Sequence, residues 1–234
     1  MASAQTINTI VWTFSFALQA LLVVSIFRRG LARRLPSFAV LIVFYPVRSA
    51  LLFVLFGHIP ADDYGSFYST LSLVDLVLQG GFIIEITVRL LRRSSEFNLR
   101  RHLLVLVPLV AAAASGVVNL ALLPHHAPIP VDRIQTFISY LLIGLFISTI
   151  LTTTSPLLRI TTLGFALYSS ISLVAQTERL SAALHRNAAA YTAWSYTIAA
   201  AYLLAVFLWV FALKPENSAK AFRTVDPEPR EVTP

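Results

Sequence analysis

Four charged side chains lie within long apolar stretches of the sequence: Arg48, Asp75, Glu85 and Arg89. Arg48 belongs to the segment FYPVRSALLFVL, and the other three belong to VDLVLQGGFIIEITVRLLRR. A charge at the centre of a bilayer costs roughly 2.5–3.5 kcal/mol on insertion scales, so each of these groups needs a partner or water. Ionisable residues in such segments are typical of ligand sites, ion paths and proton relays.

We expect Arg48 to form a bidentate ion pair with Asp75, because the two segments are antiparallel neighbours joined by a short connection. Asp75 lies about 6 Å further from the middle of its segment, a gap that an arginine side chain can cover. Tyr45 adds a hydroxyl group on the segment of Arg48. Pro46 removes a backbone hydrogen bond beside it and predicts a helix kink, as Pro108 does in a later segment.

Glu85 has two candidate partners. Arg89 follows it at the favourable i, i+4 spacing, and Arg48 lies on the neighbouring segment. Asp75 and Glu85 are separated by nearly three helical turns, so we expect them to project from a similar face, with Gln79 between them. The sequence therefore predicts one interior polar ladder formed by Arg48, Asp75, Gln79, Glu85 and Arg89.

This ladder has two interpretations, and the sequence leaves both open. It could form a binding pocket or a proton-responsive cluster, as intramembrane ionisable residues often do. It could equally be a structural ion pair that only fixes the register of two helices.

The remaining polar residues show no catalytic pattern. The chain has no cysteine and contains no Gly-x-Ser-x-Gly, P-loop or dinucleotide-binding sequence. Its five histidines show neither the HxxxH nor the HExxH spacing of metal sites. We therefore expect no enzyme activity, no catalytic residue, no metal site and no cofactor.

The composition places these residues in a membrane. Of the 234 residues, 57% are hydrophobic and only 12% are charged, whereas soluble domains carry about 25% charged residues. A membrane helix needs about 20 apolar residues, and helices satisfy their own backbone groups in hydrocarbon. The chain is therefore expected to be an all-α integral membrane bundle.

We predict seven transmembrane helices followed by a polar, proline-rich cytoplasmic tail over residues 214–234. The predicted spans cover residues 8–27, 37–57, 67–91, 102–123, 133–155, 157–181 and 189–213. Trp209 and Phe211 lie near one end of the last span, where aromatic side chains favour the membrane interface.

The loops predict the orientation of these helices. RRGLARR follows the first span and RLLRRSSEFNLRR follows the third, whereas GHIPADDYGS after the second span has no lysine or arginine. By the positive-inside rule, the N-terminus lies outside and the C-terminus lies in the cytoplasm, which indicates the cytoplasmic (inner) membrane. The net charge of +7 then suits lipid headgroups and a cytoplasmic protein partner, and not nucleic acid. A homo-oligomer is compatible with this arrangement.

Three segments carry a resemblance: FIIEITVRLLRR, DRIQTFISYLLIGLF and SYTIAAAYLLAVFLWV. They are similar to segments of small uncharacterised bacterial seven-transmembrane proteins, a resemblance that implies the fold and no particular activity. The predicted topology also resembles that of rhodopsins and G-protein-coupled receptors. However, the last span has no lysine to bind retinal, the third span is not followed by Glu/Asp-Arg-Tyr, and Asn-Pro-x-x-Tyr is absent.

Three functions remain open on these grounds. The leading expectation is a receptor-like or sensory protein that binds a small ligand, lipid or proton between its helices and signals to a cytoplasmic partner. The alternative is a small transporter or channel whose path follows Arg48, Asp75 and Glu85. The third is a structural subunit of a larger membrane complex.

Overall fold

The computed structural model describes residues 2–92, 99–122, 130–153 and 155–213, and all regular structure within these ranges is helical. The predicted tail lies outside the described residues. The helices are α1 (Ala2–Arg28), α2 (Leu31–Arg34), α3 (Pro36–Leu55), α4 (Ala61–Arg92), α5 (Leu99–Leu122), α6 (Pro130–Thr152), α7 (Pro156–Leu184) and α8 (Ala188–Ala212).

Six of the described helices, α3 to α8, are long and apolar enough to cross a membrane. The apolar segment Trp12–Arg28 of α1 is shorter. The all-α, multi-pass membrane architecture is therefore confirmed, whereas the seventh span, the orientation and the membrane concerned stay predictions.

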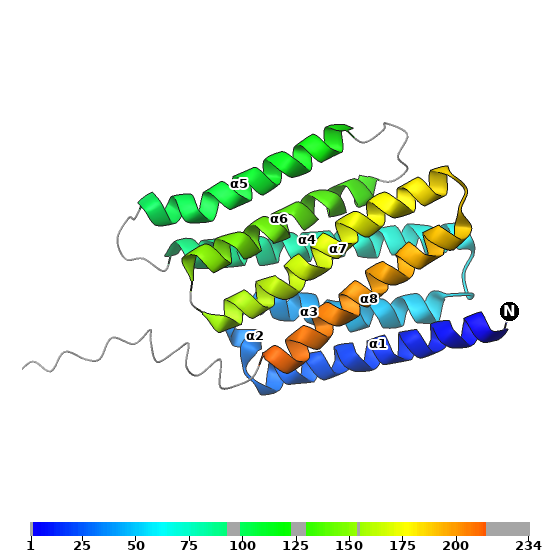
Figure 1. The fold of residues 1–234 in the computed structure, drawn as a ribbon. Coiled ribbons are helices and arrows are strands. Elements are labelled where there is room, and N and C mark those ends of the chain that lie inside the picture. Colours follow the sequence, from blue (N-terminus) through cyan, green and yellow to red (C-terminus); the bar gives the residue numbers. More distant parts are fainter. Residues whose placement is uncertain (1, 93–98, 123–129, 154, 214–234) are drawn as a thin grey trace, which may run out of the picture.

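Six helices form a closed ring in the order α1, α3, α4, α6, α7 and α8, with α8 packing back against α1. Helix α5 lies outside this ring, where it packs mainly against α6 and to a lesser extent against α4. Figure 1 shows α5 at one edge of the bundle. The centre of the ring is therefore lined by α1, α3, α4, α6, α7 and α8.

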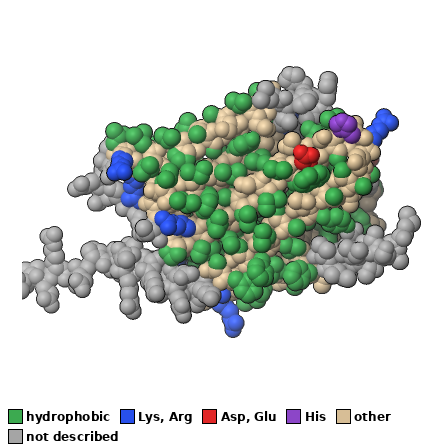
Figure 2. Space-filling view, viewed as in Figure 1, with side chains coloured by type: hydrophobic (Ala, Val, Ile, Leu, Met, Phe, Trp, Pro, Cys, Tyr) green, Lys and Arg blue, Asp and Glu red, His purple; other side chains and the backbone are tan. Residues whose placement is uncertain are grey.

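The outer surface of the bundle is strongly apolar. Val77 is 74% exposed and Val54 is 63% exposed, and hydrophobic side chains cover most of the visible face in Figure 2. Water would disfavour so large an apolar surface, whereas lipid chains accept it. The surface pattern thus agrees with a protein surrounded by lipid.

Arginines gather at one end of the bundle, which we call the basic end. It is the end at which α1, α4, α6 and α8 finish and α3, α5 and α7 begin. Its described arginines are Arg28, Arg29, Arg33, Arg34, Arg89, Arg92, Arg100, Arg101 and Arg159. The opposite end has described arginines only at 133, 179 and 186.

Four aromatic side chains fill the ring on the side of the basic end. We call them the aromatic cluster: Phe38 of α3, Phe82 of α4, Phe165 of α7 and Trp209 of α8, each at most 2% exposed. The rings of Phe82 and Phe165 lie 4.7 Å apart between centroids, as do those of Phe165 and Trp209. Phe38 packs edge-on against Trp209 at 5.4 Å. The expectation that Trp209 lies at the membrane interface was therefore wrong.

Gly164 explains how the indole of Trp209 fits between α7 and α8. A Cβ atom at residue 164 would collide with Nε1 and the ring of Trp209. Because Gly164 has no side chain, the indole can approach α7, and its N–H donates a hydrogen bond to the carbonyl oxygen of Thr161 at 3.2 Å. A glycine and a tryptophan thus hold α7 and α8 together.

The two prolines with predicted kinks lie inside helices that continue past them. Pro46 is an interior residue of α3, and Pro108 is an interior residue of α5. Each lacks the backbone N–H that would complete the helical ladder one turn earlier.

Candidate ligand-binding pocket between the helices

Arg48 of α3 and Asp75 of α4 form an ion pair in the interior of the bundle. One guanidinium nitrogen donates to Oδ2 of Asp75 at 3.1 Å, and the other donates to the hydroxyl oxygen of Ser72 at 2.9 Å. The guanidinium also lies 5.2 Å from the centre of the Tyr68 ring. The carboxylate is therefore bound through one nitrogen and not through the expected bidentate contact, because Ser72 takes the second nitrogen.

The local sequence of α4 explains this set of partners. Tyr68, Ser72, Asp75 and Gln79 follow one another at helical spacings of three or four residues, which places them along one face. Gln79 donates from Nε2 to Oδ1 of Asp75 at 3.0 Å, and both side chains are buried. Each oxygen of the Asp75 carboxylate thus already accepts one hydrogen bond.

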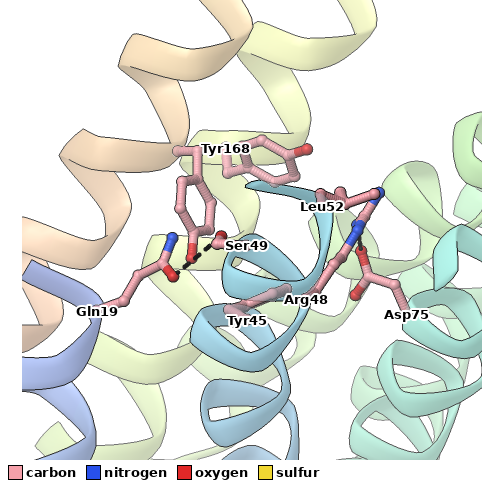
Figure 3. A pocket seen from close by; sticks show the side chains of 8 residues that line it. Gln19, Tyr45, Arg48, Ser49, Leu52, Asp75 and Tyr168 are labelled. Carbon is pink, nitrogen blue, oxygen red and sulfur yellow. Dashed lines mark hydrogen bonds and ion pairs between the residues drawn. The ribbon is translucent and has the colours of Figure 1, made fainter. Parts of the chain in front are cut away.

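A cavity of about 220 Å³ lies beside this ion pair. Five helices contribute its walls: α1, α3, α4, α7 and α8. The lining residues are Gln19, Tyr45, Arg48, Ser49, Leu52, Asp75, Tyr168 and Tyr202. Figure 3 shows Arg48 and Asp75 facing each other on one side of this space, and Gln19 and Ser49 on the other.

Three tyrosines supply most of the aromatic wall of the cavity. Tyr202 packs edge-on against Tyr45, with ring centroids 5.3 Å apart, and against Tyr168 at 6.1 Å. The hydroxyl group of Tyr202 is buried and lies beside the side chain of Gln19. On the α1 side, the hydroxyl of Ser49 donates to Oε1 of Gln19 at 3.3 Å.

Glu85 and Arg89 lie apart from this cavity. Oε2 of Glu85 accepts a hydrogen bond from the backbone N–H of Ser37 at 2.8 Å, and Oε1 lies 2.6 Å from a guanidinium nitrogen of Arg89. Of the two candidate partners of Glu85, Arg89 is therefore the one that forms the ion pair. Neither Glu85 nor Arg89 lines the cavity.

The predicted single ladder is therefore divided into two groups, for a reason found in helix geometry. Ten residues at about 100° each fall about 80° short of three full turns, so Glu85 points to one side of the face that carries Asp75. Phe82 lies much closer to the direction of Asp75 and is fully buried. Arg48, Asp75 and Gln79 form one group, and Glu85 and Arg89 form the other.

Sequence reasoning did not identify five of the lining residues: Gln19, Ser49, Leu52, Tyr168 and Tyr202. Each lies in an apolar helix at a position that no motif distinguishes. Tyr168 and Tyr202 are far from Arg48 along the chain, and only the closure of the ring brings them to the same cavity.

The cavity lining combines hydrogen-bonding groups with aromatic side chains. The cavity lining contains no histidine, lysine or cysteine, and its single carboxylate is held by Arg48 and Gln79. Among the described residues, no group of three or more metal-ligating side chains comes together.

No protein-family model, curated protein or solved structure matches this chain. The function is therefore argued from the site alone.

Proposed function

We propose that this protein is a receptor-like membrane protein that binds a small ligand in the cavity beside Arg48 and Asp75. In this proposal it is not an enzyme. It spans the cytoplasmic membrane seven times with its N-terminus outside, and it signals to a separate cytoplasmic partner at the basic end. A single observation carries the proposal: polar side chains from five different helices converge on one cavity.

The depth of the cavity supports an outward-facing ligand site. The aromatic cluster lies on the basic-end side of the cavity on every helix that contributes to both. On α4, for example, Phe82 follows Asp75 by seven residues, or about 10 Å along the helix. The cavity lies near the middle of the bundle, and with the basic end in the cytoplasm it lies on the outer side of the aromatic cluster, which forms its floor.

The aromatic cluster also connects the cavity to the basic end, so that a helix movement at the cavity can be transmitted there. Trp209 is part of the aromatic cluster and is hydrogen-bonded to the backbone of α7. One turn further, the guanidinium of Arg29 donates to the backbone carbonyl oxygens of Val210 and Leu213 at the end of α8. A shift of Tyr202 on α8 caused by a ligand would therefore reach the end of that helix and the α1–α2 connection.

The transporter alternative requires a path through the bundle along Arg48, Asp75 and Glu85. The division of these residues into two groups and the buried aromatic cluster beside them argue against such a path. A role as a purely structural subunit does not account for a polar cavity in the interior of the bundle. Both alternatives predict outcomes that differ from those of the receptor proposal.

Two matched tryptophan substitutions test the proposal. Leu52 is 7% exposed and lines the cavity, whereas its neighbour Leu51 is 41% exposed on the outer surface. We expect benzoate, benzamide or benzylamine to raise the melting temperature of the wild type and of Leu51→Trp, and not that of Leu52→Trp. Equal responses of both variants to all three probes would contradict a ligand site in this cavity.

Helix movement provides the second readout. Because the chain has no cysteine, spin labels can be attached to Arg33→Cys and Arg92→Cys, both exposed at the basic end. The probe that stabilises the wild type should change the distance between these labels. Proton flux in proteoliposomes that Asp75→Asn or Glu85→Gln abolishes would instead support a transporter.

A further inference from the structure

We infer that the cavity takes a small monocarboxylate with an apolar body, and that Asp75 takes up a proton when this ligand binds. The inference rests on the proposed function, since it names the chemical class of ligand for the same cavity. It is carried by the size of the cavity, by its surplus of hydrogen-bond donors and by the way in which Arg48 is anchored.

The volume limits the ligand to a small molecule. An apolar cavity of about 150 Å³ binds benzene, which has six non-hydrogen atoms. The cavity of about 220 Å³ therefore has room for a benzene ring with one additional small group. The faces and edges of Tyr45, Tyr168 and Tyr202, together with Leu52, provide an apolar lining for the body of such a ligand.

The polar groups of the lining select an acceptor. Its donors are the guanidinium of Arg48, the amide NH2 of Gln19 and the three tyrosine hydroxyl groups. The strongest acceptor, the Asp75 carboxylate, is already occupied on both oxygens. A carboxylate ligand matches this surplus of donors, whereas a cationic ligand would meet the guanidinium without an unpaired acid to balance it.

Arg48 can change its anionic partner without losing its position. Its second nitrogen is held by Ser72, and its guanidinium lies over the ring of Tyr68. Only the nitrogen that now donates to Asp75 has to exchange its acceptor for an oxygen of the ligand. Arg48 thus remains anchored to α4 while one hydrogen bond is exchanged.

Charge balance in the cavity then requires a proton. The Arg48–Asp75 pair is neutral, so adding a carboxylate alone would leave one uncompensated negative charge in the interior. If Oδ2 of Asp75, released by Arg48, accepts a proton from water, neutrality is restored. That proton can be donated in a hydrogen bond to the ligand carboxylate, while Oδ1 keeps the hydrogen bond from Gln79.

Asp75 is the group that takes the proton, because none of the other charged and titratable groups around it can do so. They are Arg48 and Tyr45 on α3, Tyr68 on α4 itself, Tyr168 on α7 and Tyr202 on α8. Helices α5 and α6, which also pack against α4, contribute no titratable group to the lining. Of these groups, only the carboxylate has a site for an additional proton, because a neutral tyrosine and a guanidinium already carry theirs.

Calorimetric titration of the purified protein in nanodiscs with benzoate tests the inference. Benzoate stays ionised between pH 8 and pH 5.5, so its affinity should rise about tenfold for each unit by which the pH falls, as uptake of one proton requires. Asp75→Asn imitates the protonated acid and should bind benzoate with little dependence on pH. Asp63→Asn, on the exposed start of the same helix, should keep the wild-type dependence.

Two further measurements separate the ligand class from the cavity. Tyr202→Phe should weaken benzoate binding about fivefold, whereas Tyr196→Phe, at an exposed site on α8, should not. Neutral benzamide and cationic benzylamine should bind at least tenfold more weakly than benzoate at pH 5.5.

Each contrary result has one meaning. If benzamide or benzylamine binds as tightly as benzoate and Leu52→Trp abolishes that binding, the carboxylate inference is overturned and the ligand cavity stands. A pH dependence that Asp75→Asn retains would overturn the assignment of the proton to Asp75. If Leu52→Trp alters the binding of none of the three probes, the proposed function fails together with the inference.

Discussion

Glu85 of α4 caps the first turn of α3, because its Oε2 accepts a hydrogen bond from the backbone N–H of Ser37 at 2.8 Å. Helix α3 begins with Leu35 as its N-cap residue, which offers no side-chain acceptor, and with Pro36 in its first turn. The early N–H groups of a helix need acceptors and favour negative charge. A carboxylate from the neighbouring helix supplies both, and Arg89 balances its charge.

Glu85→Ala should therefore lower the thermal stability of the protein. The loss of an N-terminal cap costs about 0.5–2 kcal/mol, and Arg89 also loses its partner. Glu85→Gln keeps an acceptor oxygen and should cost less than Glu85→Ala. Glu178→Ala, at an exposed site on α7, serves as the control in thermal melts followed by circular dichroism. A melting temperature of Glu85→Ala equal to that of Glu178→Ala would remove the capping role.

The Arg48–Asp75 pair should behave as a coupled unit. Arg48→Leu removes the cation and leaves Asp75 with Gln79 alone, so we expect a loss of about 1–3 kcal/mol, below the value for a fully buried pair. The double variant Arg48→Leu/Asp75→Leu should recover much of that loss, because no charge is then left behind. Thermal melts of the two single variants and the double variant measure the coupling, with Arg33→Leu as a surface control. Additive effects would show that the two side chains do not stabilise each other.

The surroundings of Gly164 on α7 and Gly80 on α4 predict opposite effects when each is replaced by alanine. Gly164→Ala should disrupt the aromatic cluster, because a Cβ atom there collides with the indole of Trp209; overpacking of this kind costs about 1–3 kcal/mol. Gly80→Ala meets no atom within 4 Å and replaces a helical glycine, so it should be neutral or stabilising by up to about 1 kcal/mol. Melting temperatures and tryptophan fluorescence distinguish the two. An unshifted spectrum for Gly164→Ala would show that Trp209 lies elsewhere.

Much of the fold could be predicted from the sequence, because a membrane helix depends on a local property. Long apolar segments with polar breaks between them indicate where the helices lie. The ends of α3 and α8 differ from the predicted spans by at most two residues, whereas α4 begins six residues before its predicted span. The Arg48–Asp75 contact could also be predicted, since a charge in an apolar segment needs a partner and the nearest acid lies on the next helix.

The rest of the site depends on how the helices are arranged. Nothing local distinguishes Tyr168 and Tyr202 from tyrosines on the lipid-facing surface, because neither belongs to a motif or lies next to a charged residue. Trp209 has the sequence environment of an interfacial aromatic residue. Its buried position depends on contacts with other helices, including Gly164 on α7, which leaves room for the indole. The predicted ladder failed to allow for the 80° that separates Glu85 from the face of Asp75, about one fifth of a turn.

Arg29 should stabilise the end of α8 on which the proposed signal depends. Its guanidinium donates to the carbonyl oxygens of Val210 and Leu213 at the end of α8. The last carbonyl groups of a helix have no N–H partner within that helix, and they favour positive charge. Arg29→Gln should speed amide hydrogen exchange in the last turn of α8 more than Arg28→Gln, its exposed neighbour. Equal exchange in both variants would argue against Arg29 as the link between α1 and α8.

The proposed orientation can be tested with single cysteines, because the chain has none of its own. Asp63 is exposed at the start of α4, at the end of the bundle opposite to the basic end, and Arg33 is exposed at the basic end. A membrane-impermeant maleimide should label Asp63→Cys in intact cells and Arg33→Cys only after permeabilisation. The opposite pattern would reverse the orientation, since the arginines would then lie outside against the positive-inside rule.

The number of spans depends on α1, and an epitope tag placed before Ala2 tests it against the same two cysteines. If α1 crosses the membrane, the tag lies on the side of Asp63 and should be accessible to antibody in intact cells. If α1 instead lies along the interface, the tag stays on the side of Arg33 and is reached only after permeabilisation. We expect the first result, because α1 packs against both α3 and α8 and its Gln19 reaches the cavity in the interior of the ring. We expect a helix that closes the ring at that depth to lie within the membrane along with the two helices it joins.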